Sequence, residues 1–357
     1  MIREEIKKLI KESIIKLQKQ KKIPVFDINE IKIEHPEQEI YGDYSTNIAM
    51  IIAKKAKKDP IEIAELLTEN FKNKIPDLFE RIKIIKPGFI NFFVSNKYLQ
   101  RQVKEILKKK EKFGQLDIGK GKTIMVEYAH PNTHKLFHIG HLRNITNGES
   151  IVRILKANNF KVIRANYQGD VGLHIAKCLW AMKKTENLED KIKTLKNINE
   201  KVEFLGERYV AGNKSYEENE NAKKEILEIN KQIYNKDPEI EDLRKKTRQW
   251  SLDYFEKIYK RVYTHFDRYY FESEVAQLGK EIVLKAVKKG VFEKSKGAII
   301  FPGSKYGLHD RVFITSENNP TYEAKDMELG RLQFKEYNPD LIIHNVGPEQ
   351  KEYFQVV

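Results

Sequence analysis

The feature that most constrains the fold is a strand–loop–helix–strand succession that begins at residue 123. Thr123–Tyr128 (TIMVEY) is short and β-branched and predicts a strand, and after a loop a helix is expected from about Ile139 to Asn158. Phe160–Asn166 (FKVIRAN) predicts the next strand. A strand, a helix and a second strand in such close succession make a βαβ unit. The unit predicts a parallel sheet with a ligand site at the carboxyl ends of its strands.

The residues before this unit predict a separate small domain. The apolar spacing over residues 1–20 predicts an amphipathic helix, and a second helix is expected over Ser45–Lys58. Asp59-Pro60 predicts the start of a third helix, since Asp suits the N-cap and Pro the first turn. Ile82–Val94 predicts two strands joined by a tight turn. We expect these elements to form an α+β domain over residues 1–112.

A lysine- and glycine-rich segment follows and predicts a linker, comprising Lys108–Lys112, Gly114 and Gly119–Gly121. Residues 113–357 are then expected to form an α/β domain. Residues 181–262 are charged and mostly helical, which predicts a helical insertion into this domain. Strand character returns later, at Ala298–Pro302, Arg311–Ser316 and Leu341–Val346.

Charge and cysteine content limit the classes of protein. The formal net charge is +14, which favours a polyanionic partner, although a merely solvated lysine-rich surface stays open. The single cysteine, Cys178, excludes a disulfide framework and a cysteine-built zinc site. No apolar run approaches the roughly 20 residues of a membrane span, and the charged N-terminus is unlike a signal peptide. We therefore expect a cytoplasmic protein without a membrane segment.

The strongest chemical motif is His138-Ile139-Gly140-His141, which stands where the predicted helix opens. Two imidazoles three residues apart share one face of a helical turn. At a helix N-terminus this face meets free N–H groups and suits a triphosphate. Gly140 leaves space for a purine ring, and Lys135 adds a positive charge for the phosphates. A metal site would need further ligands at fixed spacing, and none stands nearby, so we assign no metal ligand.

The segment Val126–Asn144 (VEYAHPNTHKLFHIGHLRN) closely resembles the signature region of the class I arginyl-tRNA synthetases. Further segments resemble other motifs of that family in the same order: YGDYSTN (41–47), KPGFINFF (86–93), NYQGDVG (166–172), YFES (270–273), TYEAKD (321–326) and VGPEQ (346–350). The resemblance covers nearly the whole chain, and the motifs together are highly specific.

This resemblance implies ATP-dependent activation of L-arginine to arginyl-adenylate and transfer to tRNA(Arg). It implies that residues 113–357 are a Rossmann-like class I catalytic domain and that residues 1–112 are an additional domain that binds the tRNA elbow. ATP is then a substrate and Mg²⁺ accompanies it. The arginine carboxylate attacks the α-phosphorus without a protein nucleophile, and the catalytic contribution of His138, His141 and Lys135 is charge stabilisation.

Recognition of arginine makes its own demand, because a guanidinium is planar, charged and carries five donors. Such a group calls for carboxylates and hydroxyls as acceptors. Tyr322 and Asp326 are four apart and share a face if the segment is helical. Taken singly, each acid could equally be a solvated surface group. The resemblance assigns the arginine site to Glu272, Tyr322 and Asp326 at the head group, to Asn132 and Gln350 at the α-amino and carboxylate groups, and to Glu127 as support.

The KPGFINFF segment offers a candidate RNA contact. An aromatic ring and an amide in a surface turn can stack on a base and hydrogen-bond to it. The resemblance assigns Phe89 and Asn91 to the D loop of the tRNA elbow and Lys86 to a phosphate. The alternative, that Phe89 packs into the core of the small domain, stays open.

The sequence also departs from the family pattern. Leu136 replaces a frequent proline, and Asn318-Asn319 replaces an Asp-Gly turn. Val357 falls within what should be a continuing catalytic domain, so we expect a C-terminally truncated chain, and full aminoacylation by it alone is in doubt. We expect a monomer. Two alternatives remain, a non-catalytic RNA-binding paralogue and another class I synthetase or nucleotidyltransferase.

Overall fold

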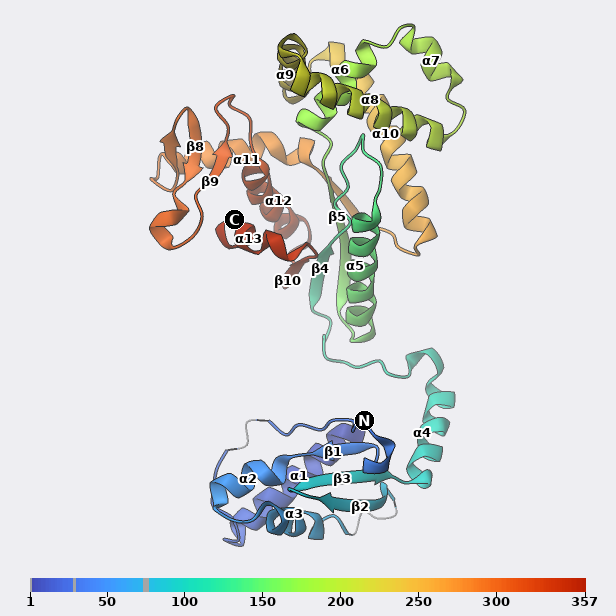
Figure 1. Cartoon of the computed structure of the whole chain (residues 1–357), viewed down its shortest axis with the longest axis vertical. Helices are drawn as coiled ribbons and strands as arrows, with labels where there is room; N and C mark the ends of the chain where they lie inside the picture. Colours follow the sequence, from blue (N-terminus) through green and yellow to red (C-terminus); the bar gives the residue numbers. More distant parts are fainter. Residues whose placement is uncertain (1, 28–29, 73–76) are drawn as a thin grey trace. The chain divides into compact units, whose positions relative to one another are not determined.

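The computed structural model describes residues 2–27, 30–72 and 77–357. The chain divides into two compact units, Met1–Gly114 and Gln115–Val357, which are described separately below (Figure 1). In the described part of the chain, no helix combines the length and hydropathy that crossing a bilayer requires.

The first unit is a three-stranded antiparallel sheet, in the order β1-β3-β2, packed against helices. Apolar side chains of the helices and of β2 and β3 share one buried core. The elements are α1 (Ile2–Lys19), η1 (Glu39–Tyr41), β1 (Tyr44–Thr46), α2 (Ile48–Ala56), α3 (Pro60–Glu69), β2 (Phe79–Ile85), β3 (Phe89–Val94), α4 (Asn96–Lys109) and η3 (Lys110–Lys112).

Local sequence signals explain most of this unit. The Asp59 carboxylate accepts a hydrogen bond from the N–H of Ile61 at 2.7 Å, so the predicted start of α3 is confirmed. Strands β2 and β3 form the predicted hairpin. The helix expected over Ser45–Lys58 is shorter, because Tyr44–Thr46 pairs with β3 as a strand.

The lysine-rich start of the expected linker is helical. Helix α4 runs to Lys109, and a 3-10 turn continues over Lys110–Lys112. The Ser95 hydroxyl caps α4 by accepting a hydrogen bond from the Tyr98 N–H at 3.1 Å. The residues expected in the linker are therefore helical at Lys108–Lys112, and the boundary between the two units lies just after them, at Gly114.

The second unit contains a parallel four-stranded sheet in the order β10-β4-β5-β6. The predicted βαβ unit is confirmed, and α5 runs alongside β4 and β5 (Figure 1). The expected α/β class, an α+β domain followed by a Rossmann-like domain, is therefore what the structure has. The elements are β4 (Thr123–Glu127), α5 (Ile139–Ala157), β5 (Lys161–Gln168), β6 (Arg268–Phe271) and β10 (Leu341–His344).

A helical insertion separates β5 from β6. Helices α6, α8, α9 and α10 share a hydrophobic core of their own. The insertion starts at Leu173, earlier than the predicted residue 181. Its elements are α6 (Leu173–Lys183), α7 (Leu188–Thr194), α8 (Ile198–Glu218), α9 (Glu220–Asn235) and α10 (Pro238–Arg261).

The segment between β6 and β10 carries a second, small antiparallel sheet, in the order β7-β8-β9. The strands expected at Ala298–Pro302 and Arg311–Ser316 are present, but they pair with each other and not with the parallel sheet. The elements of this segment are α11 (Glu272–Val287), β7 (Glu293–Ser295), β8 (Ala298–Phe301), η4 (Gly303–Tyr306), β9 (Arg311–Ile314) and α12 (Tyr322–Tyr337). After β10 follow η5 (Pro348–Gln350) and α13 (Lys351–Val356).

Candidate functional site

A cavity of about 550 Å³ opens where β4, β5, β6 and β10 end. All six residues that the sequence assigned to arginine line it, although they come from segments far apart in the chain: Glu127, Asn132, Glu272, Tyr322, Asp326 and Gln350. The sequence reasoning did not find the other lining residues: His130, Asn144, Tyr167, Gly169, Arg311, Glu323, Val346, Gly347, Tyr353 and Phe354. Of these, all but Arg311, Tyr353 and Phe354 lie inside the quoted motifs.

Asp326 is a buried acid of this cavity whose pKa is shifted. It lies one turn after Tyr322 on α12. The Tyr353 hydroxyl donates a hydrogen bond to its Oδ2 at 2.5 Å, whereas its buried Oδ1 has no partner among the described residues. Burial raises the pKa of Asp326 to about 7, and the negative charges of Glu127 and Glu272 add to this shift. Asp326 therefore presents an unsatisfied acceptor oxygen. A cation bound beside it would favour the ionised form of its carboxyl group.

Glu272 is the first residue of α11 and is almost fully buried. Its Oε2 lies 2.7 Å from the Lys325 ammonium, which is itself buried. Burial raises the pKa of Glu272, while the charge of Lys325 opposes that shift. One oxygen of Glu272 is thus paired with an internal cation, an interaction that the sequence did not predict.

Glu127 ends β4 beneath the same cavity and is held by several polar neighbours. Gln333 donates to one carboxylate oxygen, and the His344 Nδ1 lies 3.1 Å from the other. Burial by itself raises the pKa of Glu127, but the hydrogen bond and charge of His344, with His130, hold it below its ordinary value. Glu127 therefore stays ionised at neutral pH and contributes a fixed negative charge.

A second hollow of about 400 Å³ shares Glu272 and Tyr322 with this cavity. Lys135 lines it, with its ammonium 4.9 Å from the centre of the Tyr209 ring. Lys177 and Lys325 also line this hollow, which places three lysine ammonium groups along its wall.

The two histidines of the motif stand at the start of α5, as predicted. Neither lines the two hollows described above as the described residues form them. His138 is exposed, His141 is half-buried, and their ring centres are 4.0 Å apart. The Gly140 N–H donates to His138 Nδ1 at 3.1 Å, and the His138 N–H donates to His141 Nδ1 at 3.2 Å.

These hydrogen bonds fix the tautomer of both rings. Because each Nδ1 accepts a hydrogen bond from a backbone N–H, a neutral ring carries its own proton on Nε2. Burial lowers the pKa of His141 to about 4, helped by the positive charges of His138, His130 and Lys135. His141 is therefore neutral at pH 7 and presents an Nε2–H donor.

Polar contacts attach α5 to the ends of the strands. The Asn144 side chain accepts from the Ala129 N–H at 2.7 Å and donates to the Asn345 carbonyl at 2.5 Å. Farther along α5, Glu149 forms a salt bridge with the buried Arg164 of β5 at 2.9 Å. These contacts fix the histidine pair relative to β4 and β10.

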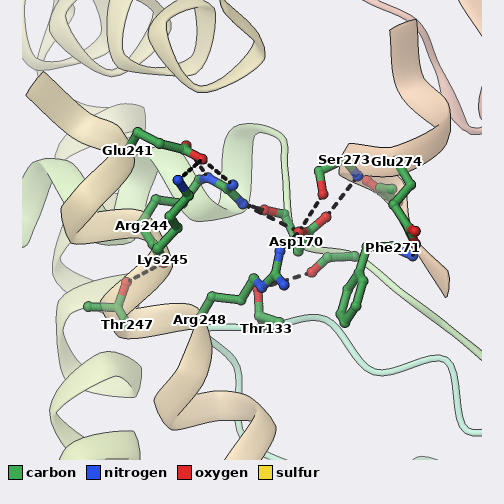
Figure 2. A network of polar contacts seen from close by, with 12 residues as sticks. Thr133, Asp170, Glu241, Arg244, Lys245, Thr247, Arg248, Phe271, Ser273 and Glu274 are labelled. Atoms are coloured by element: carbon green, nitrogen blue, oxygen red, sulfur yellow. Dashed lines mark hydrogen bonds and ion pairs between the residues drawn. The ribbon is translucent and has the colours of Figure 1, made fainter. Parts of the chain in front are cut away.

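Figure 2 shows a second set of polar contacts, centred on Asp170. This residue follows β5 and is fully buried. Its carboxylate contacts Arg244 and Arg248 of α10 and Ser273 of α11. The sequence singled out the NYQGDVG motif but assigned Asp170 no role.

In the first unit, Lys86, Phe89 and Asn91 line one hollow of about 380 Å³, together with His35 and Tyr41. The Phe89 side chain is 38% exposed, whereas Asn91 is buried and its Oδ1 accepts a hydrogen bond from Ser45 at 2.7 Å. Phe89 is therefore available to a partner. The Asn91 carbonyl oxygen already has one.

Comparison with known proteins follows the same division of the chain. Residues 102–357 match the family described as tRNA synthetases class I (R), catalytic domain. The parallel sheet and its cavity are thus those of a class I tRNA synthetase. Residues 4–94 match the arginyl tRNA synthetase N terminal domain. The chain belongs to the arginyl-tRNA synthetase family.

Individual relatives agree with this assignment. The chain is 33% identical to an arginine–tRNA ligase of Borreliella afzelii over 98% of its own length and 60% of the relative's. It is 32% identical to one of Thermococcus sibiricus, over 86% and 50% of the two chains. The chain thus spans about 60% or less of the length of these relatives.

Two solved structures share the fold. Arginyl-tRNA synthetase from Plasmodium falciparum superimposes with a TM-score of 0.71 at 21% identity, over 99% of this chain and 60% of that one. The Thermus thermophilus arginyl-tRNA synthetase gives a TM-score of 0.63 at 22% identity, over 94% and 53%.

Proposed function

We propose that the chain activates L-arginine with ATP, as the first half-reaction of an arginine–tRNA ligase. The observation that carries this proposal is the acid-lined cavity in which the buried Oδ1 of Asp326 has no partner among the described residues. A buried acceptor without a donor costs free energy, and a guanidinium N–H is a donor that would satisfy it. The positive charge of arginine would also balance the acids around it.

The remaining residues of the cavity suit the other end of the amino acid. Asn132 and Gln350 offer both amide donors and carbonyl acceptors, which match an α-carboxylate and an α-ammonium group. Tyr322 offers a hydroxyl at the rim shared by the two hollows. We assign arginine to Asn132, Glu272, Tyr322, Asp326 and Gln350, with Glu127 as a fixed supporting charge.

We assign the ATP phosphates to the start of α5. His138 and His141 would donate from Nε2, and the first helical turn, which includes Ile139 and Gly140, adds the positive end of the helix dipole. Lys135 would supply a further positive charge. These donors are already oriented, so they stabilise charge that develops on the α-phosphate without reorganising.

The reaction needs no covalent intermediate with the protein. A carboxylate oxygen of arginine forms a bond to the α-phosphorus, and the bond from that phosphorus to the bridging oxygen breaks. Pyrophosphate leaves with the electron pair of that bond. In the second half-reaction, a ribose hydroxyl of tRNA(Arg) would attack the arginyl carbonyl and release AMP.

Mg²⁺ is assigned no protein ligand. Within the described residues, no three His, Cys, Asp or Glu side chains are grouped so that they could hold a metal ion. Magnesium usually keeps several waters and binds substrate phosphates. Any Mg²⁺ would therefore arrive with ATP.

We further propose that the first unit contacts the tRNA. The exposed Phe89 ring could stack on an unpaired base, Lys86 could reach a phosphate, and Asn91 could use its amide N–H. The net charge of +14 favours this polyanion. We place the reaction in the cytoplasm and expect a monomer.

The test is arginine-dependent exchange of pyrophosphate into ATP, measured with and without tRNA for arginine, lysine and citrulline. Citrulline has the shape of arginine without its charge, so it isolates the contribution of the acids. We expect exchange with arginine alone. Because the chain spans about 60% of its relatives' length, arginine binding is measured by calorimetry in parallel. Equal binding of arginine and citrulline would contradict the proposal.

A further inference from the structure

We propose that Asp170 is a positioning residue for the arginine site, because it fixes the first turn of α11, which carries Glu272, to helix α10 of the helical insertion. This inference rests on the proposed function, since it assumes that Glu272 faces the arginine. It assigns Asp170, Arg248 and Ser273 a role in affinity although none of them lines the arginine cavity as described.

The Asp170 carboxylate accepts hydrogen bonds from two different elements (Figure 2). Its Oδ1 accepts from the Ser273 N–H at 2.9 Å, and its Oδ2 accepts from the Ser273 hydroxyl at 2.7 Å. On the other side, Oδ2 accepts from Arg248 at 2.7 Å and from Arg244 at 3.3 Å. One buried carboxylate thus joins α10 to α11.

The contact with Ser273 acts as a helix cap supplied from outside the helix. The N–H of Ser273 belongs to the first turn of α11, where backbone N–H groups lack partners within the helix. A carboxylate at this position satisfies the N–H and interacts favourably with the helix dipole. Because Glu272 directly precedes Ser273, fixing this turn also fixes where the Glu272 side chain enters the cavity.

The neighbouring residue, Gly169, links the same segment to Asn132. The Gly169 carbonyl accepts from the Thr133 N–H at 2.9 Å, and Asn132 pairs with Gly169 as an isolated bridge. A Cβ at Gly169 would lie 2.0 Å from the Asn132 Oδ1, so a larger residue here would displace the Asn132 amide. Gly169 therefore positions Asn132, and Asp170 positions Glu272.

Arg248 is one of the two α10 residues that bind the Asp170 carboxylate. Its guanidinium is partly exposed, and it also lies 4.3 Å from the centre of the Phe271 ring, the residue before α11. Arg244, in contrast, is also paired with Glu241 of its own helix at 2.7 Å. Removal of Arg248 therefore weakens the link to Asp170 while Arg244 still balances the buried charge.

The experiment uses Arg248→Ala and Ser273→Ala, with Lys245→Ala as the matched control. Lys245 lies on the same helix and pairs with Glu241 but forms no hydrogen bond or ion pair with Asp170 among the described residues. Asp170→Asn is avoided as the main variant, because it leaves two guanidinium groups facing a neutral side chain and risks unfolding. Calorimetry measures the Kd for arginine and for ATP, and thermal unfolding monitors the fold.

We expect the arginine Kd to rise about three- to tenfold in both variants, the loss typical of one hydrogen bond, while the ATP Kd is unchanged. The control should bind both ligands as the wild type does, and Arg248→Lys should recover part of the arginine affinity.

Wild-type arginine affinity in both alanine variants would refute the positioning role. A parallel loss of arginine affinity, ATP affinity and thermal stability would refute it too, since that indicates a purely structural contact. Failure of the wild-type chain to bind arginine would instead contradict the proposed function.

Discussion

The affinity for arginine should depend on pH through Asp326. Burial, with the charges of Glu127 and Glu272, raises the pKa of this carboxyl to about 7. A guanidinium binds the ionised carboxylate, so binding must release the proton wherever Asp326 is protonated. Affinity should therefore rise with pH and level off above the pKa.

The magnitude follows from one titrating proton. At one pH unit below the pKa about one molecule in ten is ionised, so the arginine Kd at pH 6 should be roughly tenfold higher than its plateau value. At pH 8 the carboxyl is mostly ionised and the Kd should lie near the plateau. Calorimetry from pH 5.5 to 8.5 in two buffers of different ionisation enthalpy measures both the Kd and the released proton.

Asp326→Asn should weaken arginine binding and abolish this pH dependence. Glu336→Gln is the matched control, since Glu336 lies on the same helix and pairs with Arg268 away from the cavity. An arginine Kd that is equal at pH 6 and pH 8 in the wild type would refute the reasoning. So would an unchanged pH slope in Asp326→Asn.

The same shift predicts a change in stability. A carboxyl with a raised pKa in the folded state favours folding when protonated, and this contribution is lost as pH rises from its unfolded value near 4 towards 7. Between pH 5 and pH 8 the wild type should therefore lose about 1–3 kcal/mol of free energy of unfolding that Asp326→Asn does not lose. Denaturant titrations at the two pH values measure this difference.

Three further variants test other parts of the site. Tyr353→Phe removes the donor to Asp326, which raises the pKa of that carboxyl further, so the midpoint of the arginine pH profile should move upward; a fixed midpoint contradicts this. Gly148→Ala places a methyl group 2.3 Å from a buried tyrosine ring and should lower the free energy of unfolding by about 1–3 kcal/mol, whereas Gly330→Ala, in open space, should not. His141→Ala should slow pyrophosphate exchange about 100-fold with the arginine Kd unchanged, and an intact exchange rate would remove this histidine from the proposed ATP site.

Features of the sequence that depend on a few neighbouring residues predicted local structure well. The N-cap at Asp59, the amphipathic helix at the N-terminus and the βαβ unit around α5 all follow from spacing within one or two turns. The motif residues assigned to arginine also meet in one cavity, which periodicity alone did not predict and the family resemblance did.

Elements whose identity depends on distant partners were predicted less well. Strand β6 lies in an aromatic-rich segment without a clear alternation, and only its pairing with β5 defines it as a strand. The strands β8 and β9 look locally like further strands of the parallel sheet, but their partners are each other. The pattern of side chains along a strand does not specify which sheet that strand joins.

The sequence by itself determined the βαβ unit around α5, the start of α3 and the candidate residues of both ligand sites, because these depend on short-range sterics, capping and motif identity. Only the tertiary structure decided the electrostatics of the site. Lys325 pairs with Glu272, Tyr353 donates to Asp326, and Asp170 joins α10 to α11. Most of these partners lie tens of residues apart in the chain, and burial and hydrogen bonding between them arise only when the chain has folded.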